Sequence, residues 1–186
     1  MRRISVIGFG KIGQAVAANI LQQDISITAI DTNPDLQKLF KEGLFYTIEP
    51  GVNEILTSAY HESKLIISDD FALIKDSDAV IVAIPLLVDQ EKKILDAPFL
   101  DAMHAMAPFL DNRTLIVIET SIPVGFGRKS VVPAIESKGK IHGTDFLLAH
   151  SPERIKSGTM LEQLLLIPKV IGGISEEATD KAFQIY

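Results

Sequence analysis

The stretch that decides the fold is SVIGFGKIGQAV, residues 5–16. The apolar run Ile4–Ile7 leads directly into the glycine pattern GxGxxG at residues 8–13, and a helical pattern of apolar residues begins at Lys11. A strand that turns on glycines into a helix is typical of an α/β fold with a parallel sheet. This stretch therefore predicts that strands and helices alternate along the rest of the chain.

The remaining sequence continues that alternation. Seven apolar runs indicate strands, at Ile4–Ile7, Ile25–Ile30, Leu65–Ile67, Ala79–Ile84, Leu115–Ile118, Phe146–Ala149 and Val170–Ile171. Several are unbroken runs of Val, Ile and Leu, as in parallel strands covered on both faces. Helical patterns lie at Lys11–Gln23, Pro34–Glu42, Pro50–Tyr60, Pro98–Leu110, Val124–Lys138 (with a kink or an earlier end at Pro133) and Ser175–Tyr186, where Ser175 can cap the helix. We expect one domain over residues 1–186, an α/β Rossmann-like fold whose doubly wound, mostly parallel sheet has helices on both faces.

The composition excludes several classes of protein. With 186 residues, 47% of them hydrophobic, the chain can bury a substantial core. Its net charge of −6 argues against nucleic acid as a partner. No apolar run approaches the roughly 20 residues that span a bilayer, and no signal-peptide pattern is present, so we expect a cytoplasmic protein. The chain has no cysteine and its four histidines lack metal-ligand spacing, so we expect no thiolate chemistry and no metal site within these residues.

The glycine loop fits a dinucleotide. Gly8 allows the tight turn, Gly10 lets the backbone approach a pyrophosphate, and Gly13 lets helix and strand pack closely. The helix N-terminus offers free N–H groups and a partial positive charge to the phosphates. The predicted cofactor-binding residues of this loop are Gly8, Phe9, Gly10, Lys11, Ile12 and Gly13.

Asp31 ends the second predicted strand, at the position where a carboxylate accepts hydrogen bonds from the adenosine ribose. A carboxylate there repels a 2′-phosphate, and no arginine follows in Thr32–Leu36, so the sequence favours NAD over NADP. The alternative is a glycine turn in an α/β protein that binds another ligand or none.

Polar side chains follow two later predicted strands. Thr120 and Ser121 precede a proline in ETSIP, residues 119–123, where they could fix a water or the cofactor amide, or only cap the next helix. Glu153 in HSPER, residues 150–154, is a candidate general base or water-orienting group, or only a surface carboxylate paired with Arg154 or a lysine. The stretch IEPGV, residues 48–52, indicates mostly turn chemistry.

The ordered motifs SVIGFGKIG, IEPGV, ETSIPVG, HSPER and PKVIGG resemble the UDP-glucose/GDP-mannose dehydrogenase family over essentially the whole chain. The resemblance is to the N-terminal NAD-binding domain. The triplet PER, where many UDP-glucose enzymes carry PEF, is similar to the branch acting on UDP-N-acetyl-hexosamines such as UDP-N-acetylmannosamine. Such enzymes oxidise the C6 alcohol of the sugar to an aldehyde and then to a carboxylate, with two NAD reduced.

The resemblance implies roles for several residues of this chain. Glu153 matches the family glutamate that holds or activates water, and Ser121 stands where a threonine is usual, with Thr120 keeping the second hydroxyl. Family members commonly have a Thr-Pro pair after the fourth strand, and this chain keeps only the proline, Pro85. Arg154 is a candidate contact of the substrate.

The chain also departs from the family pattern. Ser157 replaces a second glutamate of many members, and the cysteine that traps the aldehyde is absent. The family's lysine, asparagine, dimer-forming central helix and nucleotide-sugar domain are expected beyond Tyr186. We therefore expect these residues to bind NAD without completing the oxidation, and to expose an apolar patch near Ala182, Phe183, Ile185 and Tyr186.

Two alternatives remain from the sequence. One is a stand-alone NAD-binding module that acts as a sensor or scaffold. The other is a fragment of a hydroxyacid or 6-phosphogluconate type of dehydrogenase, which has a similar glycine loop.

Overall fold

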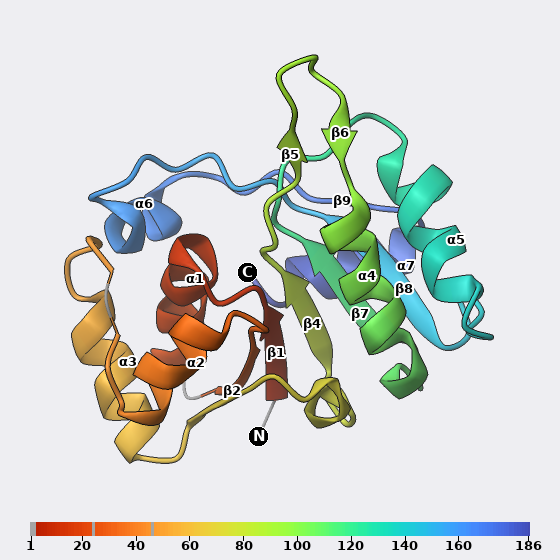
Figure 1. Cartoon of the computed structure of the whole chain (residues 1–186). Helices are drawn as coiled ribbons and strands as arrows, with labels where there is room; N and C mark the ends of the chain where they lie inside the picture. The colour runs from red at the N-terminus through yellow and green to blue at the C-terminus, as the bar shows by residue number, and fades with distance from the viewer. Residues whose placement is uncertain (1–2, 24, 46) are drawn as a thin grey trace.

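The computed structural model describes residues 3–23, 25–45 and 47–186. Within them, one seven-stranded sheet has the order β3-β2-β1-β4-β7-β8-β9. Figure 1 shows β1 and β4 side by side in the middle of the molecule. Its strands are β1 (Arg3–Ile7), β2 (Ser26–Ile30), β3 (Leu65–Ser68), β4 (Ala79–Val82), β7 (Thr114–Ile118), β8 (Phe146–His150) and β9 (Gly172–Gly173). All neighbouring strands pair in parallel except β9, which runs antiparallel to β8. The chain reverses its direction of winding between β1 and β4, so their carboxyl ends form the crevice of a doubly wound sheet.

Helices cover both faces of the sheet, as predicted (Figure 1). They are α1 (Lys11–Leu21), α2 (Pro34–Lys41), α3 (Val52–His61), α4 (Ala97–Met106), α5 (Val132–Glu136), α6 (Met160–Leu166) and α7 (Glu176–Phe183). One hydrophobic cluster joins the sheet to residues of α1, α3, α6 and α7, and a second joins it to residues of α4 and α5. Side chains of β1 alternate between the two, since Val6 belongs to the first and Ile7 to the second. Among the described residues, no helix has both the length and the apolar character needed to cross a membrane.

The last predicted strand is wrong in place. Pairing with β8 uses Gly172 and Gly173 rather than Val170 and Ile171, and Val170 is 56% exposed. A Cβ on Gly173 would lie 2.5 Å from the Thr179 nitrogen, so this strand needs glycine where it packs under α7. The strand was predicted two residues too early, because Val170 and Ile171 are apolar and the glycines that pair are not recognised as a strand.

Two helices begin differently from the expectation. The expected helix Val124–Lys138 begins as a π turn, Gly127–Val131, in which the Val132 N–H bonds to the Gly127 carbonyl just before Pro133, whose nitrogen has no proton. The helix expected from Pro50 begins at Val52, after Gly51 in the left-handed conformation.

The apolar residues expected on the surface at the end of α7 are only partly there. Phe183 is 75% exposed, but Ala182 is buried in the first hydrophobic cluster. The Ser175 cap is confirmed, because its hydroxyl oxygen accepts the Ala178 N–H at 3.2 Å.

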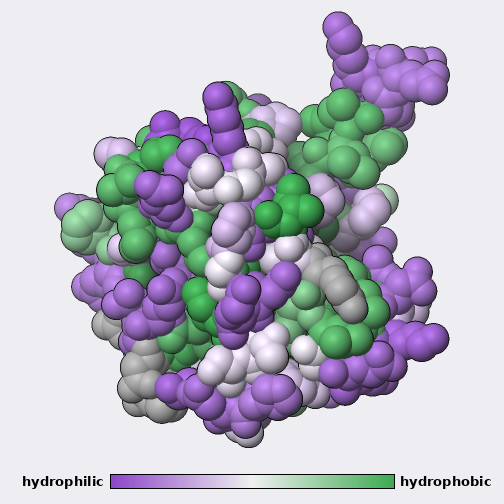
Figure 2. Space-filling view, turned by 90° about the vertical axis from the view of Figure 1, so that its left-hand side faces the viewer, coloured by the Kyte–Doolittle hydropathy of each residue, from purple (hydrophilic) through white to green (hydrophobic). Residues whose placement is uncertain are grey.

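A small hairpin, β5 (Leu87–Val88) paired with β6 (Ile94–Leu95), was not predicted. It projects above the sheet in Figure 1, and in Figure 2 its hydrophilic tip extends beyond a hydrophobic base at the upper right. Two paired residues a strand are too few for an alternating pattern to be recognised.

Candidate functional site

A cavity of about 900 Å³ opens at the carboxyl ends of β1, β2, β4 and β7. The predicted site residues that line it are Gly8, Gly10, Lys11, Ile12, Asp31, Pro85, Thr120, Ser121 and Glu153. Three others lie outside its lining. Phe9 is buried edge-on against Phe40, Gly13 is buried in α1, and Arg154 is exposed with its guanidinium donating to the Pro168 carbonyl at 2.5 Å.

The three glycines meet different constraints. Gly8 has φ +86°, and a Cβ there would lie 2.9 Å from the Ile84 nitrogen. A Cβ on Gly13 would lie 2.1 Å from the Gly8 carbonyl oxygen, so α1 can approach the turn only without a side chain. A Cβ on Gly10 would meet nothing within 4 Å, although this residue lines the cavity. The space in front of Gly10 is therefore open to a ligand, whereas the other two glycines shape the turn.

Asp31 holds the glycine turn against the end of β2. One carboxylate oxygen accepts the Phe9 N–H at 2.7 Å and the other accepts the Asn33 N–H at 2.9 Å. The side chain still lines the cavity together with Thr32, Asn33 and Leu36. Asp31 thus fixes the glycine turn while its carboxylate remains part of the cavity wall.

Thr120 and Ser121 have different surroundings. The Thr120 hydroxyl donates to the Ile84 carbonyl at 2.6 Å, which ties the end of β7 to the loop that carries Pro85. Ser121 is exposed at the cavity wall. Helix capping, the alternative for this pair, is wrong, because the π turn begins after Phe126 without a side-chain cap.

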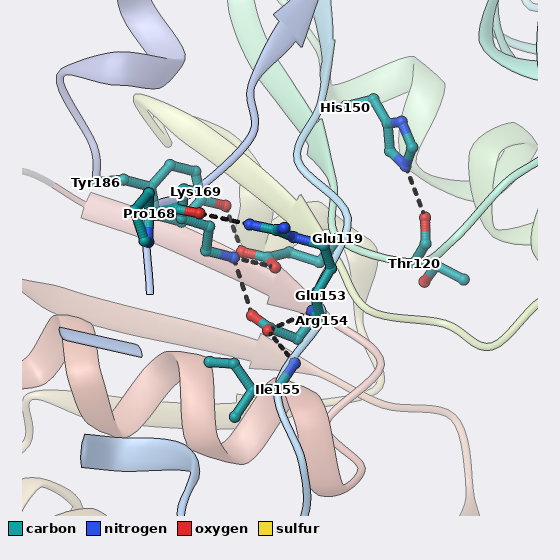
Figure 3. Close-up of polar contacts among 9 residues, drawn as sticks. All are labelled: Glu119, Thr120, His150, Glu153, Arg154, Ile155, Pro168, Lys169 and Tyr186. Atoms are coloured by element: carbon teal, nitrogen blue, oxygen red, sulfur yellow. Dashed lines mark hydrogen bonds and ion pairs between the residues drawn. The ribbon is translucent and has the colours of Figure 1, made fainter. Parts of the chain in front are cut away.

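Glu153 belongs to a buried ionic cluster (Figure 3). One carboxylate oxygen accepts the N–H groups of Arg154 and Ile155 at 2.6 and 2.9 Å, and the other lies 3.0 Å from the Lys169 Nζ. The same Nζ lies 2.5 Å from Glu119, whose second oxygen accepts a hydrogen bond from the Tyr186 hydroxyl. The sequence left open whether Glu153 pairs with Arg154 or with a lysine at the surface. Its partner is Lys169, and the pair is buried.

The charge balance of this cluster is unusual for an interior. The side chains of Glu119, Glu153 and Lys169 are 0%, 5% and 14% exposed. Burial raises the pKa of Glu119, against the attraction of Lys169 and the hydrogen bond from Tyr186. Both carboxylates line the cavity, so the cluster forms part of its wall.

Sequence reasoning missed Glu119, Lys169 and Glu49. Glu119 directly precedes the two hydroxyl residues, and Lys169 lies in PKVIGG, but no periodicity reveals that they meet across 50 positions. Glu49, interpreted as part of a turn, is 2% exposed and accepts N–H bonds from Gly158 and Met160. A charged residue between the apolar Ile48 and Pro50 was the available signal.

The family comparison agrees with this architecture. The model of the UDP-glucose/GDP-mannose dehydrogenase family, NAD binding domain, matches residues 2–186. UDP-N-acetyl-D-mannosamine dehydrogenase from Pyrococcus horikoshii is 29% identical over 99% of this chain and 44% of the relative. The enzyme of that name from Methanocaldococcus jannaschii is 31% identical over 100% of this chain and 42% of the relative. The chain thus spans less than half the length of these relatives.

Solved structures give the same result. The UDP-D-ManNAc dehydrogenase of Pyrococcus horikoshii superposes with a TM-score of 0.91 at 28% identity, covering 99% of this chain and 44% of that one. The UDP-N-acetyl-mannosamine dehydrogenase Cap5O of Staphylococcus aureus gives 0.88 at 26% identity, covering 99% and 45%. The cavity, the glycine turn and the match over residues 2–186 place the chain in the UDP-glucose/GDP-mannose dehydrogenase family, as its NAD-binding domain.

Proposed function

We propose that this domain binds NAD in preference to NADP, in the cavity at the carboxyl ends of the strands. The observation that carries the proposal is the Asp31 carboxylate, which stands beside the glycine turn in a cavity end otherwise lined by Thr32, Asn33 and Leu36. A 2′-phosphate there would meet a negative charge and no cation among those side chains. The open space at Gly10 suits the pyrophosphate, and the N-terminus of α1 supplies its N–H groups.

The longer protein is proposed to be a UDP-sugar 6-dehydrogenase, which oxidises a C6 alcohol to a carboxylate. This follows from the names of the relatives, which are UDP-N-acetyl-D-mannosamine dehydrogenases. When bound, NAD supplies the hydride acceptor. From this chain, Glu153 and Ser121 face the cavity and orient water or hydroxyl groups, and Arg154 contacts the sugar nucleotide outside it. The nucleophilic cysteine, the sugar-binding domain and the dimer interface belong to sequence outside these residues.

Glu153 is better suited to orienting a group than to removing its proton. Two backbone N–H groups and Lys169 already occupy three of the positions at which its carboxylate can accept hydrogen bonds. One further donor, such as a water, can be held there in a fixed direction.

Titration calorimetry of this chain with NAD and, separately, with NADP tests the cofactor proposal. Heat from NAD and none from NADP at the same concentrations is the expected result. Gly10→Val is expected to lose NAD binding, since a Cβ at this position meets no protein atom within 4 Å and the residue lines the cavity. Equal affinity for both dinucleotides, or unchanged binding by Gly10→Val, contradicts the proposal.

A further inference from the structure

The two ends of the cavity carry acidic groups of different kinds. Asp31 lies at one end, on β2, and Glu119 and Glu153 line the other, after β7 and β8. The glycine turn lies between them, after β1. A dinucleotide whose adenosine ribose meets Asp31 and whose pyrophosphate meets the turn extends its nicotinamide half toward β7 and β8. This step rests on the proposed binding of NAD.

The wall at that end has a net negative charge. Glu119 and Glu153 share the single ammonium of Lys169, at 2.5 and 3.0 Å. Burial opposes the ionisation of Glu119, whereas the Lys169 ammonium and the Tyr186 hydroxyl favour it. With both carboxylates ionised, the two carboxylates and one ammonium leave a net charge of −1 in a group of side chains that are at most 14% exposed. The neighbouring Arg154 is exposed and directs its guanidinium to the Pro168 carbonyl, so water screens its charge (Figure 3). Tyr186 contributes a neutral hydroxyl.

The oxidised and reduced cofactors differ by one positive charge, which lies on the nicotinamide ring. A buried negative charge near that ring attracts the pyridinium of NAD⁺ and does nothing comparable for the neutral ring of NADH. We propose that the net charge of the Glu119–Lys169–Glu153 cluster determines how strongly the domain prefers NAD⁺ over NADH. Lys169 and Glu119 are then specificity-determining residues for the oxidation state of the cofactor. An enzyme that reduces two NAD per substrate gains from a site that releases NADH readily.

A structural role alone predicts a different behaviour. If the cluster only holds the loop of Glu153 against β7, its mutation weakens the binding of both dinucleotides equally. If its charge acts on the ring, mutation changes the ratio of the two dissociation constants. Both dissociation constants are measured on one preparation. A partly unfolded sample lowers both apparent affinities by the same factor, which cancels in their ratio.

The test uses fluorescence or calorimetric titration of this chain with NAD⁺ and NADH at pH 8. Glu119→Gln brings the net charge to zero and is expected to shift the Kd ratio toward NADH by roughly three- to tenfold. Adding Lys169→Gln to that variant returns the charge to −1 and is expected to return the ratio to that of the parent chain. Glu153→Gln also brings the net charge of the cluster to zero, and it replaces Glu119→Gln if the Glu119 variant does not fold. Glu162→Gln, an exposed carboxylate on α6, is the control and leaves the ratio unchanged.

The outcomes separate this inference from the proposed function. An unchanged ratio in Glu119→Gln or Glu153→Gln, with both dinucleotides still bound, overturns the charge effect and leaves NAD binding standing. A shifted ratio that the double variant fails to restore also overturns it, since the effect then does not follow charge. Failure of the parent chain to bind either dinucleotide removes the proposed function itself.

Discussion

Both carboxylate oxygens of Glu49 accept the N–H of Gly158, which lies 109 positions further along the chain, at 2.9 and 2.8 Å. The Met160 N–H adds a bond at 3.1 Å, and the Lys11 Nζ lies 3.5 Å from the same carboxylate. Lys11 also donates to the Ser157 hydroxyl. Glu49 therefore connects the loop before α3 to the start of α6 and to the residue that opens α1.

Glu49→Gln is expected to lower the free energy of unfolding by about 1–3 kcal/mol at neutral pH, because an amide cannot accept all of these bonds. Desolvation opposes ionisation, but the N–H donors of Gly158 and Met160 and the charge of Lys11 together lower the pKa of Glu49 below 4.5. A lowered folded pKa gives stability that is present above pH 4.5 and lost as the pH falls through the folded value.

The difference between the parent chain and Glu49→Gln should therefore shrink as the pH falls below 4.5. Urea unfolding at several pH values measures it. Glu54→Gln, an exposed carboxylate in the first turn of α3, is the control and should cost little. A difference that stays constant down to pH 3 would show that the charge of Glu49 contributes nothing.

Gly10→Val should lose NAD binding but keep its stability, whereas Gly13→Ala should lose stability. A Cβ at residue 10 meets no protein atom within 4 Å, so Gly10→Val should unfold like the parent chain. At Gly13 a methyl group would lie 2.1 Å from a backbone oxygen, and we expect a loss of about 3 kcal/mol of stability, at the upper end of overpacking costs. Thermal unfolding and calorimetry on both variants check this. A stable Gly13→Ala chain would be inconsistent with the packing of α1.

Asp31→Asn should weaken NAD binding by about 1.5–3 kcal/mol, since the hydrogen bonds of an ionised carboxylate to the ribose are charge-assisted. The same change should narrow the difference between NAD and NADP. Asp35→Asn removes one charge from the exposed start of α2, four residues away, and serves as the control. Equal effects of the two substitutions in calorimetry would assign Asp31 only a general electrostatic role.

The sequence predicted the parts of this molecule that depend on local pattern. Six of the seven sheet strands overlap the predicted ranges, because strands covered on both faces must be apolar throughout. The two-residue strands β5, β6 and β9 were missed or misplaced, since contacts with distant segments hold them rather than their own composition. The strand between α6 and α7 is made of glycine, the residue with the weakest strand signal.

The candidate site divides along the same line. That Asp31 and Thr120 line one cavity was predicted from their positions at strand ends, because parallel strands bring their carboxyl ends together. Their hydrogen-bond partners were not predicted. Asp31 accepts a hydrogen bond from the Phe9 N–H, and Thr120 donates one to the Ile84 carbonyl. Both bonds depend on the three-dimensional path of the loops, which the sequence pattern does not reveal. Lys169 is the clearest case, since its role depends on two carboxylates that lie 50 and 16 positions away.

Thr120→Val is expected to lower stability by about 1 kcal/mol, because the Ile84 carbonyl loses its donor. Thr120→Ser keeps the hydroxyl and should restore most of the loss. Ser121→Ala should leave stability unchanged, since that hydroxyl is exposed at the cavity wall. Chemical denaturation of the three variants makes the comparison, and equal losses in Thr120→Val and Ser121→Ala would contradict these distinct surroundings.

In the proposed UDP-sugar dehydrogenase, Glu153 should matter more for turnover than for the binding of NAD. Glu153→Gln keeps a side chain of the same shape at the cavity wall but removes the oxygen that both faces Lys169 and can hold a water. Turnover should fall by about 10²-fold or more, as for a lost acid–base or orienting group, while the Kd for NAD changes only a few-fold. Steady-state kinetics and NAD titration of one preparation measure both quantities. Since Glu153 also anchors Lys169, a purely structural role would lower turnover and NAD affinity together, and Glu119→Gln would then reproduce the whole defect.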